Sequence, residues 1–369
     1  MNTQIIDLTD NLWLETLSKL RHDIYHLPEY VYLESLRNKA AAEAILIFEA
    51  DKIFFLPYFG RHCDGLVEEN LATEDFFDVV SPYGYPGIVL SEAAAKDREF
   101  VKLAMNQLIS ALRAKGVCSA FFRLHPILNQ GFEEILDTEI CKITGETISI
   151  DLRLSEAKIW QQTQKSQRKQ ISRCKRDGFT ARMVPLIPYV DEFTQVYHET
   201  MRRASSVEYY YSFDSNYFLQ LAEALGEKLH LCLIELNNQI ASAGLYTECC
   251  GIVQSTFGGT RTKFLKQSPN SLRVDYARSW AKERGNDFLH LGGGVGSYKD
   301  GVYNFKATFS EQRHNFLTMR LILDEEKYRY LVKLRAKSLN TETEELLNSN
   351  FFPAYRSIDS GWKKSTNSE

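Results

Sequence analysis

The sequence predicts a mixed α/β protein made of two similar units, each with a partly antiparallel sheet and flanking helices. Apolar runs joined by short turns predict strand hairpins at 44–59 and 229–248. Each hairpin is followed by an amphipathic helix that stops at a glycine, Gly116 or Gly285, and then by a strand. The two glycines lie about 170 residues apart in the same local order, so we interpret the chain as a duplication of one α/β unit.

The first half is expected to hold the first copy of this unit. Phe100, Leu108 and Leu112 recur at helical spacing and predict a helix with one apolar face. Prolines and glycines over 81–87 predict a rigid loop. In this half we expect helices at 11–20, 29–39, 97–115 and 132–136, and strands at 44–48, 52–59, 117–124 and 147–152.

The second half repeats the order beyond a basic linking helix. Leu272, Tyr276 and Trp280 lie four residues apart and predict one packed helix face. We expect helices at 191–204, 216–225, 271–284 and 325–347, and strands at 229–236, 240–248, 252–257, 288–291 and 315–323. The predicted domains are therefore 1–154 and 179–348, with a basic helix over 155–178 between them and a C-terminal tail over 349–369.

Composition predicts a globular protein of the cytoplasm. The 369 residues are 44% apolar and 25% charged, and no apolar run approaches the ~18 residues that a membrane span needs. A net charge of -4 argues against a surface that coats nucleic acid. The seven cysteines show no Cys-x-x-Cys pair and no zinc-type spacing with histidine, so we expect a reducing compartment and no metal. The first ten residues lack the features of a signal peptide.

A glycine cluster follows the predicted strand at 288–291. Gly292, Gly293, Gly294 and Gly296 remove every Cβ where that strand ends, which permits positive φ or close approach of another group. Lys306 follows, with Phe305 before it and Phe309 three residues on. Two interpretations stay open: a turn with a solvated lysine, or a positive charge held in a cleft.

The linking helix carries five cations whose spacing places them on one helical face. They are Lys165, Arg168, Lys169, Arg173 and Arg176, with Ile159, Ile171 and Cys174 left for packing. Such a face is either solvated or a site for an anion, such as tRNA phosphates, the coenzyme A pyrophosphate or a sugar-nucleotide diphosphate. Arg168 and Arg173 are the expected phosphate contacts, because arginine binds phosphate through two donors.

Three further residues are candidates on residue type alone. Arg203 ends a helix just before a tyrosine run that includes Tyr210. Two interpretations stay open: the pair binds a nucleotide or sugar, or the arginine compensates the negative end of the helix dipole while the tyrosine packs. His290 lies on the strand before the glycines and is either a general base for an amine or a core histidine. Asp300 and Glu311 are the alternative bases.

The second half resembles the FemABX branch of the acyltransferase superfamily with the GNAT fold, of the kind found in bacterial surface-polysaccharide gene sets. The matching residues are Leu289-His290-Leu291-Gly292-Gly293-Gly294, Phe305-Lys306 and Phe309-Ser310, with the helix and strand over 271–291, the basic helix over 165–178 and the tail over 351–356. The resemblance extends loosely through the first half, and it implies two tandem GNAT-like domains.

The resemblance implies an N-acyltransferase that uses aminoacyl-tRNA or acyl-coenzyme A. The implied acceptor is an amine of a cell-envelope precursor, either an amino sugar or a peptidoglycan peptide, and peripheral contact with a membrane stays open. Lys306 would stabilise negative charge on the acyl carbonyl, beside Phe305, Gly293 and Gly294.

One departure weakens coenzyme A as the donor. The segment at 266–271 lacks the glycines of a pyrophosphate loop, and its proline, Pro269, removes an amide donor. The free amides at the start of the following helix remain available to an anion. The alternatives are an acetyl-coenzyme A-dependent enzyme acting on a small amine or nucleotide amino sugar, and a non-catalytic module that binds a nucleotide sugar or RNA.

Overall fold

The computed structural model describes residues 1–63, 76–203 and 213–357, which form two compact units. The first unit comprises Met1–Leu20, Glu34–Ile143 and the chain from Leu317, and the second comprises Arg21–Leu33 and Thr144–Phe316. Both units are discontinuous in sequence, unlike the contiguous domains predicted with boundaries at 154 and 179.

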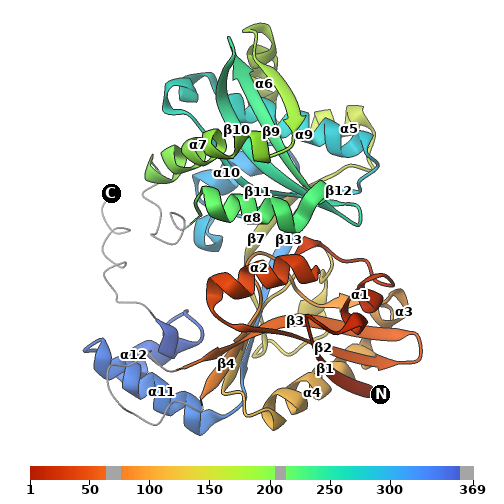
Figure 1. Cartoon of the computed structure of the whole chain (residues 1–369), viewed down its shortest axis with the longest axis vertical. Coiled ribbons are helices and arrows are strands. Elements are labelled where there is room, and N and C mark those ends of the chain that lie inside the picture. Colours follow the sequence, from red (N-terminus) through yellow and green to blue (C-terminus); the bar gives the residue numbers. More distant parts are fainter. Residues whose placement is uncertain (64–75, 204–212, 358–369) are drawn as a thin grey trace. The chain divides into compact units, whose positions relative to one another are not determined.

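The first unit is a mixed sheet covered by helices. Its strands lie in the order β1 (Asn2–Asp7), β2 (Ala41–Glu49), β3 (Lys52–His62), β4 (Phe77–Val80), β6 (Ser119–Arg123) and β13 (Arg313–Ile322), with β5 (Val89–Leu90) paired to β3. The helices α1 (Asn11–Leu17), α3 (Glu92–Ala95) and α4 (Arg98–Ala114) flank it, and α4 packs on β2 and β3 (Figure 1). Asp97 caps α4 by accepting from the amide of Phe100, and Gly116 ends it with φ 80°.

The C-terminal residues pack against this first unit. Two helices, α11 (Glu325–Ser338) and α12 (Thr343–Leu347), follow β13. Tyr355 is fully buried, and its hydroxyl donates to Asp78 on β4 over 3.0 Å. Arg356 and Arg61 pair with the same carboxylate, which keeps this buried charge compensated. The tail over 351–356 therefore has a structural role in the first unit.

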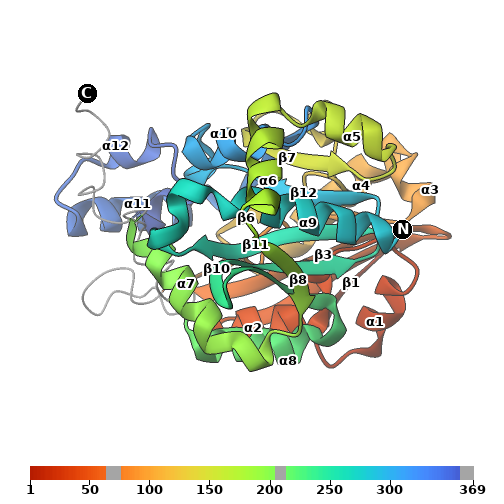
Figure 2. The ribbon, with the colours of Figure 1, turned by 90° about the horizontal axis from the view of Figure 1, so that it is seen from above.

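The second unit repeats the arrangement of sheet and helices. Its strands lie in the order β7 (Cys141–Asp151), β12 (Phe288–Gly292), β11 (Ile252–Thr260), β10 (Gln239–Cys249), β9 (Leu229–Leu236) and β8 (Thr180–Val184). Its helices are α5 (Glu156–Gln162), α6 (Lys165–Arg176), α7 (Val190–Arg203), α8 (Ser215–Leu225), α9 (Pro269–Glu283) and α10 (Gly301–Ala307). Figure 2 shows α7 and α8 on one face of this sheet and α6 and α9 on the other.

Both units contain the same motif of a hairpin, a third strand, a helix and a parallel strand. In the first unit α4 connects β4 to β6, and these strands pair in parallel; in the second α9 connects β11 to β12 in the same way. Gly116 and Gly285 end the two helices with the same φ of 80°. The predicted mixed α/β fold with an internal repeat is thus confirmed.

The strand after this motif is exchanged between the two halves of the chain. β13, from the second half, pairs antiparallel with β6, whereas β7, from the first half, pairs antiparallel with β12. This exchange explains why boundaries drawn from element order alone do not match the two compact units. Within residues 1–63, 76–203 and 213–357, no helix combines the length and the hydropathy that crossing a membrane requires.

Candidate functional site

The glycine cluster forms a tightly packed end to β12. Gly292 has φ 76°, a conformation that side chains other than glycine rarely adopt. A Cβ on Gly293 would lie 2.8 Å from the carbonyl oxygen of Glu146, and a Cβ on Gly294 would overlap the carbonyl oxygen of Tyr298. Two neighbouring segments therefore approach the backbone here, as the glycine pattern predicts for this strand end.

Lys306 is held at this strand end by the helix α10. Asp300 caps α10 by accepting from the amide of Tyr303 over 2.8 Å, and it also accepts from the amide of Val295 over 3.2 Å. The Lys306 ammonium donates to the carbonyl oxygen of Gly293 over 2.6 Å, and its side chain is half-buried. Lys306 and the glycine cluster are thus in direct contact, which the alternative of a fully solvated lysine does not describe.

Burial is the main influence on how readily Lys306 releases its proton. Burial lowers the pKa of Lys306 to about 8, with a smaller upward effect of Asp300 and a smaller downward effect of Arg273. An amine with this pKa is still mainly protonated at neutral pH. One of its three N–H groups bonds to Gly293, so the other two can donate to an incoming oxygen.

Arg273 is a buried cation near this site that sequence reasoning missed. It lies on α9 and donates to the carbonyl oxygen of Ala243 over 2.7 Å and to the side chain of Asn270 over 2.8 Å. Gly244 on β10 and Gly258 on β11 face each other, and a Cβ on either would overlap the guanidinium of Arg273. Facing glycines on neighbouring strands were the signal, because a strand glycine often marks close approach of another group.

Glu146 fixes α10 from the side of β7. Its carboxylate accepts from the hydroxyl of Tyr303 and pairs with Lys299 at 3.3 Å and Arg313 at 3.5 Å. Burial alone would raise the pKa of Glu146, but the hydrogen bonds from Tyr303 and Lys299 outweigh it and lower the pKa. Glu146 is therefore an ionised anchor for the helix that carries Lys306.

His290 does not fit the predicted role of a general base. The ring is fully buried, with Nδ1 2.6 Å from Gln254 and Nε2 2.9 Å from Thr147. Gln254 donates its amide to Asp23 over 2.6 Å, so its carbonyl oxygen faces His290 and accepts from Nδ1. Nε2 then accepts from the Thr147 hydroxyl, which leaves no lone pair for an amine; the interpretation as a core histidine describes this ring.

The two aromatic residues around Lys306 pack onto the hydrophobic core of the second unit. Phe305 and Phe309 meet edge to face with ring centroids 5.2 Å apart. Phe309 is buried and Phe305 is half-buried against the same cluster, so both rings stabilise the end of α10. Phe305 is expected to line the site only through the face that the core leaves exposed.

The basic face of α6 lines a shallow groove. The groove is bordered by Trp160, Lys165, Arg168, Lys169, Gln170, Ser172, Arg173 and Arg176, so all five predicted cations lie along it. Arg168 donates to the carbonyl oxygen of Trp160 over 3.0 Å, and Arg173 pairs with Asp177 at 3.3 Å. Arg173 is exposed and Arg168 is half-buried along the groove, so Arg173 is the more available of the two for a phosphate contact.

The opposite face of α6 is anchored next to α9 and α10. Gln167 donates to the hydroxyl of Ser271 in the first turn of α9 over 2.7 Å, and Ile171 and Cys174 are buried, as predicted. At the start of α6 the amide of Gln164 donates to the carbonyl oxygen of Thr308, two residues after Lys306. The basic groove and the Lys306 helix are therefore joined by hydrogen bonds within the second unit.

Arg203 is fixed by the backbone and neighbouring threonines. It donates to the carbonyl oxygen of Thr260 over 2.5 Å and to the hydroxyl of Thr262 over 2.7 Å, beside a depression that Arg202 and Arg261 also line. These bonds occupy much of its guanidinium, which favours a structural role. Tyr210 lies outside the described residues.

Comparison with known proteins reveals similarity at the level of the fold. No protein-family model and no curated protein sequence matches the chain. The crystal structure of FemX superposes with a TM-score of 0.67 over 89% of this chain and 99% of FemX, at 11% identity. A conserved protein of unknown function from Bacteroides thetaiotaomicron gives 0.52 over 87% and 99%, also at 11% identity.

A third solved structure has a similar fold. The C-terminal domain of a putative lysylphosphatidylglycerol synthetase from Agrobacterium fabrum gives a TM-score of 0.51 over 82% of this chain and 90% of that domain, at 15% identity. Together with the repeated motif, these structures show the FemX-like fold that the resemblance implies.

Proposed function

We propose that this protein is an N-acyltransferase in which Lys306 stabilises the oxyanion formed when an amine attacks an acyl carbonyl. The observation that carries the proposal is the 2.6 Å bond between the Lys306 ammonium and Gly293, which fixes a half-buried charge at the glycine-lined end of β12. A fixed cation in a partly dry site stabilises developing negative charge more than it stabilises the neutral carbonyl of the substrate.

The reaction requires few groups beyond this cation. The amine nitrogen forms a bond to the acyl carbon, the carbonyl oxygen becomes anionic beside Lys306, and the bond to the ester oxygen or thioester sulfur then breaks. The amine proton leaves with the hydroxyl or thiol product, so atoms and charges balance. Since His290 has both ring nitrogens bonded, we do not assign it a role in this proton transfer.

We propose aminoacyl-tRNA as the donor, with acyl-coenzyme A as the alternative. Five cations along α6 give a groove that suits several successive phosphates, and the start of α6 bonds directly to the end of the Lys306 helix. The first turn of α9, by contrast, begins with Pro269, which has no amide donor, and the amide of Ser271 in that turn already donates to the carbonyl oxygen of Ser268 over 3.0 Å. This arrangement offers fewer free amides to a coenzyme A pyrophosphate.

The proposed acceptor is an amine on a cell-envelope precursor, an amino sugar or a peptidoglycan peptide. The support for this acceptor is the resemblance to FemABX-type proteins together with the FemX-like fold. The acceptor nitrogen would approach the carbonyl carbon from above or below the plane of the acyl group, while Lys306 contacts only the oxygen.

A product search with two donors tests the proposal. Purified protein is mixed with small-molecule extract of the host and either a pool of charged tRNA or acetyl-coenzyme A, and mass spectrometry follows the mass gained by an amine. We expect product with charged tRNA, and no product when the tRNA is first digested with nuclease. We expect Lys306→Ala to lower the rate by a factor of about 10² to 10³. Lys263→Ala, which removes an exposed lysine elsewhere in the second unit, is the control.

Each alternative has its own outcome in this experiment. Product with acetyl-coenzyme A alone would replace the proposed donor and keep the acyltransferase. Saturable RNA or nucleotide-sugar binding through α6, with no covalent product under either condition, would indicate a binding module. Unchanged turnover of a folded Lys306→Ala variant would remove the proposed role of this lysine.

A further inference from the structure

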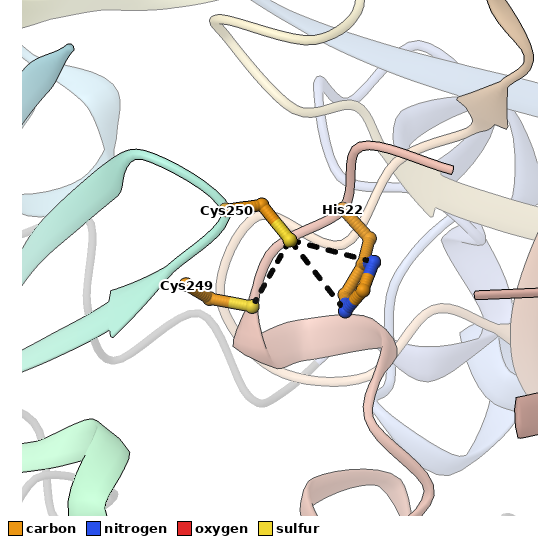
Figure 3. A group of neighbouring side chains, drawn as sticks. All are labelled: His22, Cys249 and Cys250. Atoms are coloured by element: carbon orange, nitrogen blue, oxygen red, sulfur yellow. Dashed lines mark hydrogen bonds between the residues drawn. The ribbon is translucent and has the colours of Figure 1, made fainter. Parts of the chain in front are cut away.

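His22, Cys249 and Cys250 form a cluster of metal-binding side chains in the second unit (Figure 3). Cys249 is the last residue of β10 and Cys250 lies in the turn to β11, whereas His22 precedes Cys250 by 228 residues. The two sulfur atoms are 3.8 Å apart, and the Cys250 sulfur lies 3.7 Å from Nδ1 and 3.9 Å from Nε2 of His22. All three side chains present their donor atoms within 4.8 Å of one another.

The backbone around the cluster is fixed by the residues on either side of His22. Arg21 donates to the carbonyl oxygen of Cys250 over 3.2 Å and pairs with Asp287 at 2.7 Å. Asp23 accepts from Gln254 on β11 over 2.6 Å. Because both neighbours bond to the β10–β11 hairpin or the start of the next strand, the imidazole is held against Cys250 by contacts that do not involve its own ring.

The turn that carries the cysteines is equally well defined. Cys250 and Gly251 have φ values of 44° and 79°, so both adopt the left-handed conformation of a tight hairpin turn. The carbonyl oxygen of Gly251 accepts from the amide of Asp287, the residue just before β12, over 2.8 Å, which connects the turn to the start of that strand. The Cys249 side chain is buried and that of Cys250 is exposed, which leaves one side of the cluster open to solvent.

The distances match a tetrahedral zinc site. With Zn–S bonds of about 2.3 Å and Zn–N bonds of about 2.0 to 2.1 Å, a tetrahedron places two sulfurs about 3.8 Å apart and a sulfur and a nitrogen about 3.6 Å apart. The observed 3.8 Å and 3.7 Å agree with both values. A linear two-thiolate ion would need sulfurs about 4.6 Å apart, twice the same bond length, which the present turn does not provide.

We propose that His22, Cys249 and Cys250 bind one Zn²⁺ ion in tetrahedral coordination, with a solvent molecule as the fourth ligand on the exposed side. The ion would join the segment Arg21–Leu33 to the β10–β11 hairpin and so close a long loop of the chain. From the sequence no metal is expected, because no histidine lies at zinc-type spacing from a cysteine. The histidine of this site instead comes from a distant segment that folds onto the hairpin.

The proposed site is separate from the Lys306 site. Ile252, just after the cysteine turn, pairs with Phe288 at the start of β12, and the glycine cluster begins at the other end of that strand, at Gly292. Four residues of strand span roughly 13 Å. The ion would therefore stabilise the second unit without touching the acyl group, and its presence does not depend on the proposed transferase activity.

Metal content of the full chain tests the proposal. Protein purified under reducing conditions is incubated with Zn²⁺, desalted and analysed for metal, together with His22→Gln, Cys250→Ser and a control, Cys141→Ala, that removes a buried thiol elsewhere. We expect one zinc per chain in the wild type and the control and loss of most of it in the other two. Zn²⁺ should also raise the unfolding midpoint of the wild type by at least ~3 °C and leave His22→Gln unchanged.

Co²⁺ provides a second measurement that reports geometry. Tetrahedral cobalt with thiolate ligands should give visible absorption bands in the wild type that His22→Gln weakens. Absence of bound zinc in the wild type, or full zinc content in both His22→Gln and Cys250→Ser, would overturn the proposal. A protein mass lower by two hydrogens, with no metal bound, would overturn the proposal and assign a disulfide between the neighbouring cysteines. If Cys250→Ser does not fold, the zinc content of His22→Gln alone tests the proposal.

Discussion

Lys306 should make the stability of the protein depend on pH in a defined direction. Its pKa is lowered from 10.5 to about 8 by burial, so the folded chain loses this proton at lower pH than the unfolded chain. Between these two values the unfolded chain binds more protons, and stability therefore rises with pH. A difference of this size corresponds to up to ~3 kcal/mol of unfolding free energy, because one pKa unit is worth about 1.4 kcal/mol.

Lys306→Met isolates this contribution. We expect the unfolding free energy of the wild type, minus that of Lys306→Met, to increase by up to ~3 kcal/mol from pH 7 to pH 10.5, since the other titrating groups are common to both proteins. Urea unfolding at several pH values measures the unfolding free energies of the wild type and of Lys306→Met. Lys263→Met, which removes an exposed lysine, should not reproduce this increase.

If the difference in unfolding free energy between the wild type and Lys306→Met does not change over this pH range, the reasoning is refuted. Such a result would mean that the Lys306 ammonium is as well solvated in the folded chain as in the unfolded chain, and it would remove the argument for a partly dry cation at the strand end. A decrease with rising pH would be inconsistent with burial as the dominant effect.

Three other changes test the geometry of the site. Gly294→Ala should lower stability by at least ~1 kcal/mol, because the new Cβ overlaps the carbonyl of Tyr298, whereas Gly60→Ala, where the added Cβ meets nothing within 4 Å, should be near neutral; thermal unfolding compares them. Gly258→Ala should be destabilising, and combining it with Arg273→Ala should cost less than the sum of the two changes by at least ~0.5 kcal/mol, which a double-mutant cycle in urea measures. Additivity would show that the guanidinium does not occupy this space. Arg168→Ala should weaken tRNA binding and reduce the slope of log affinity against log salt by about 1, and an unchanged slope would place Arg168 outside the phosphate contacts.

The sequence predicted the repeated core of each unit well, because local signals determine it. The helices α4 and α9 both end at a glycine in the left-handed conformation, Gly116 and Gly285, and α4 also has strong apolar periodicity; both helices were found at nearly the expected bounds. The short strands β4 and β8 were missed. β4 has only four residues and includes the buried Asp78. In β8, at the edge of the sheet, Thr180 is exposed and the other four residues are half-buried, so neither strand gives a clear apolar alternation.

The candidate site was predicted only where chemistry and backbone signals coincide. Lys306 could be placed because glycines mark the strand end that it contacts. Arg273 was missed because its signal, the facing glycines Gly244 and Gly258, depends on strand register, which one sequence does not provide. His290 was ambiguous for a similar reason: its partners, Gln254 and Thr147, come from two other strands.

The swapped pairing of β7 and β13 has a consequence for how the chain matures during synthesis. Leu317–Ile322 completes the first unit, so the N-terminal half leaves the ribosome with β6 lacking a neighbour on that side until most of the polypeptide has been made. Cutting the gene between the apparent repeats would give two fragments that each carry the other's last strand. Coexpressed fragments should therefore restore folded protein together when neither is stable alone.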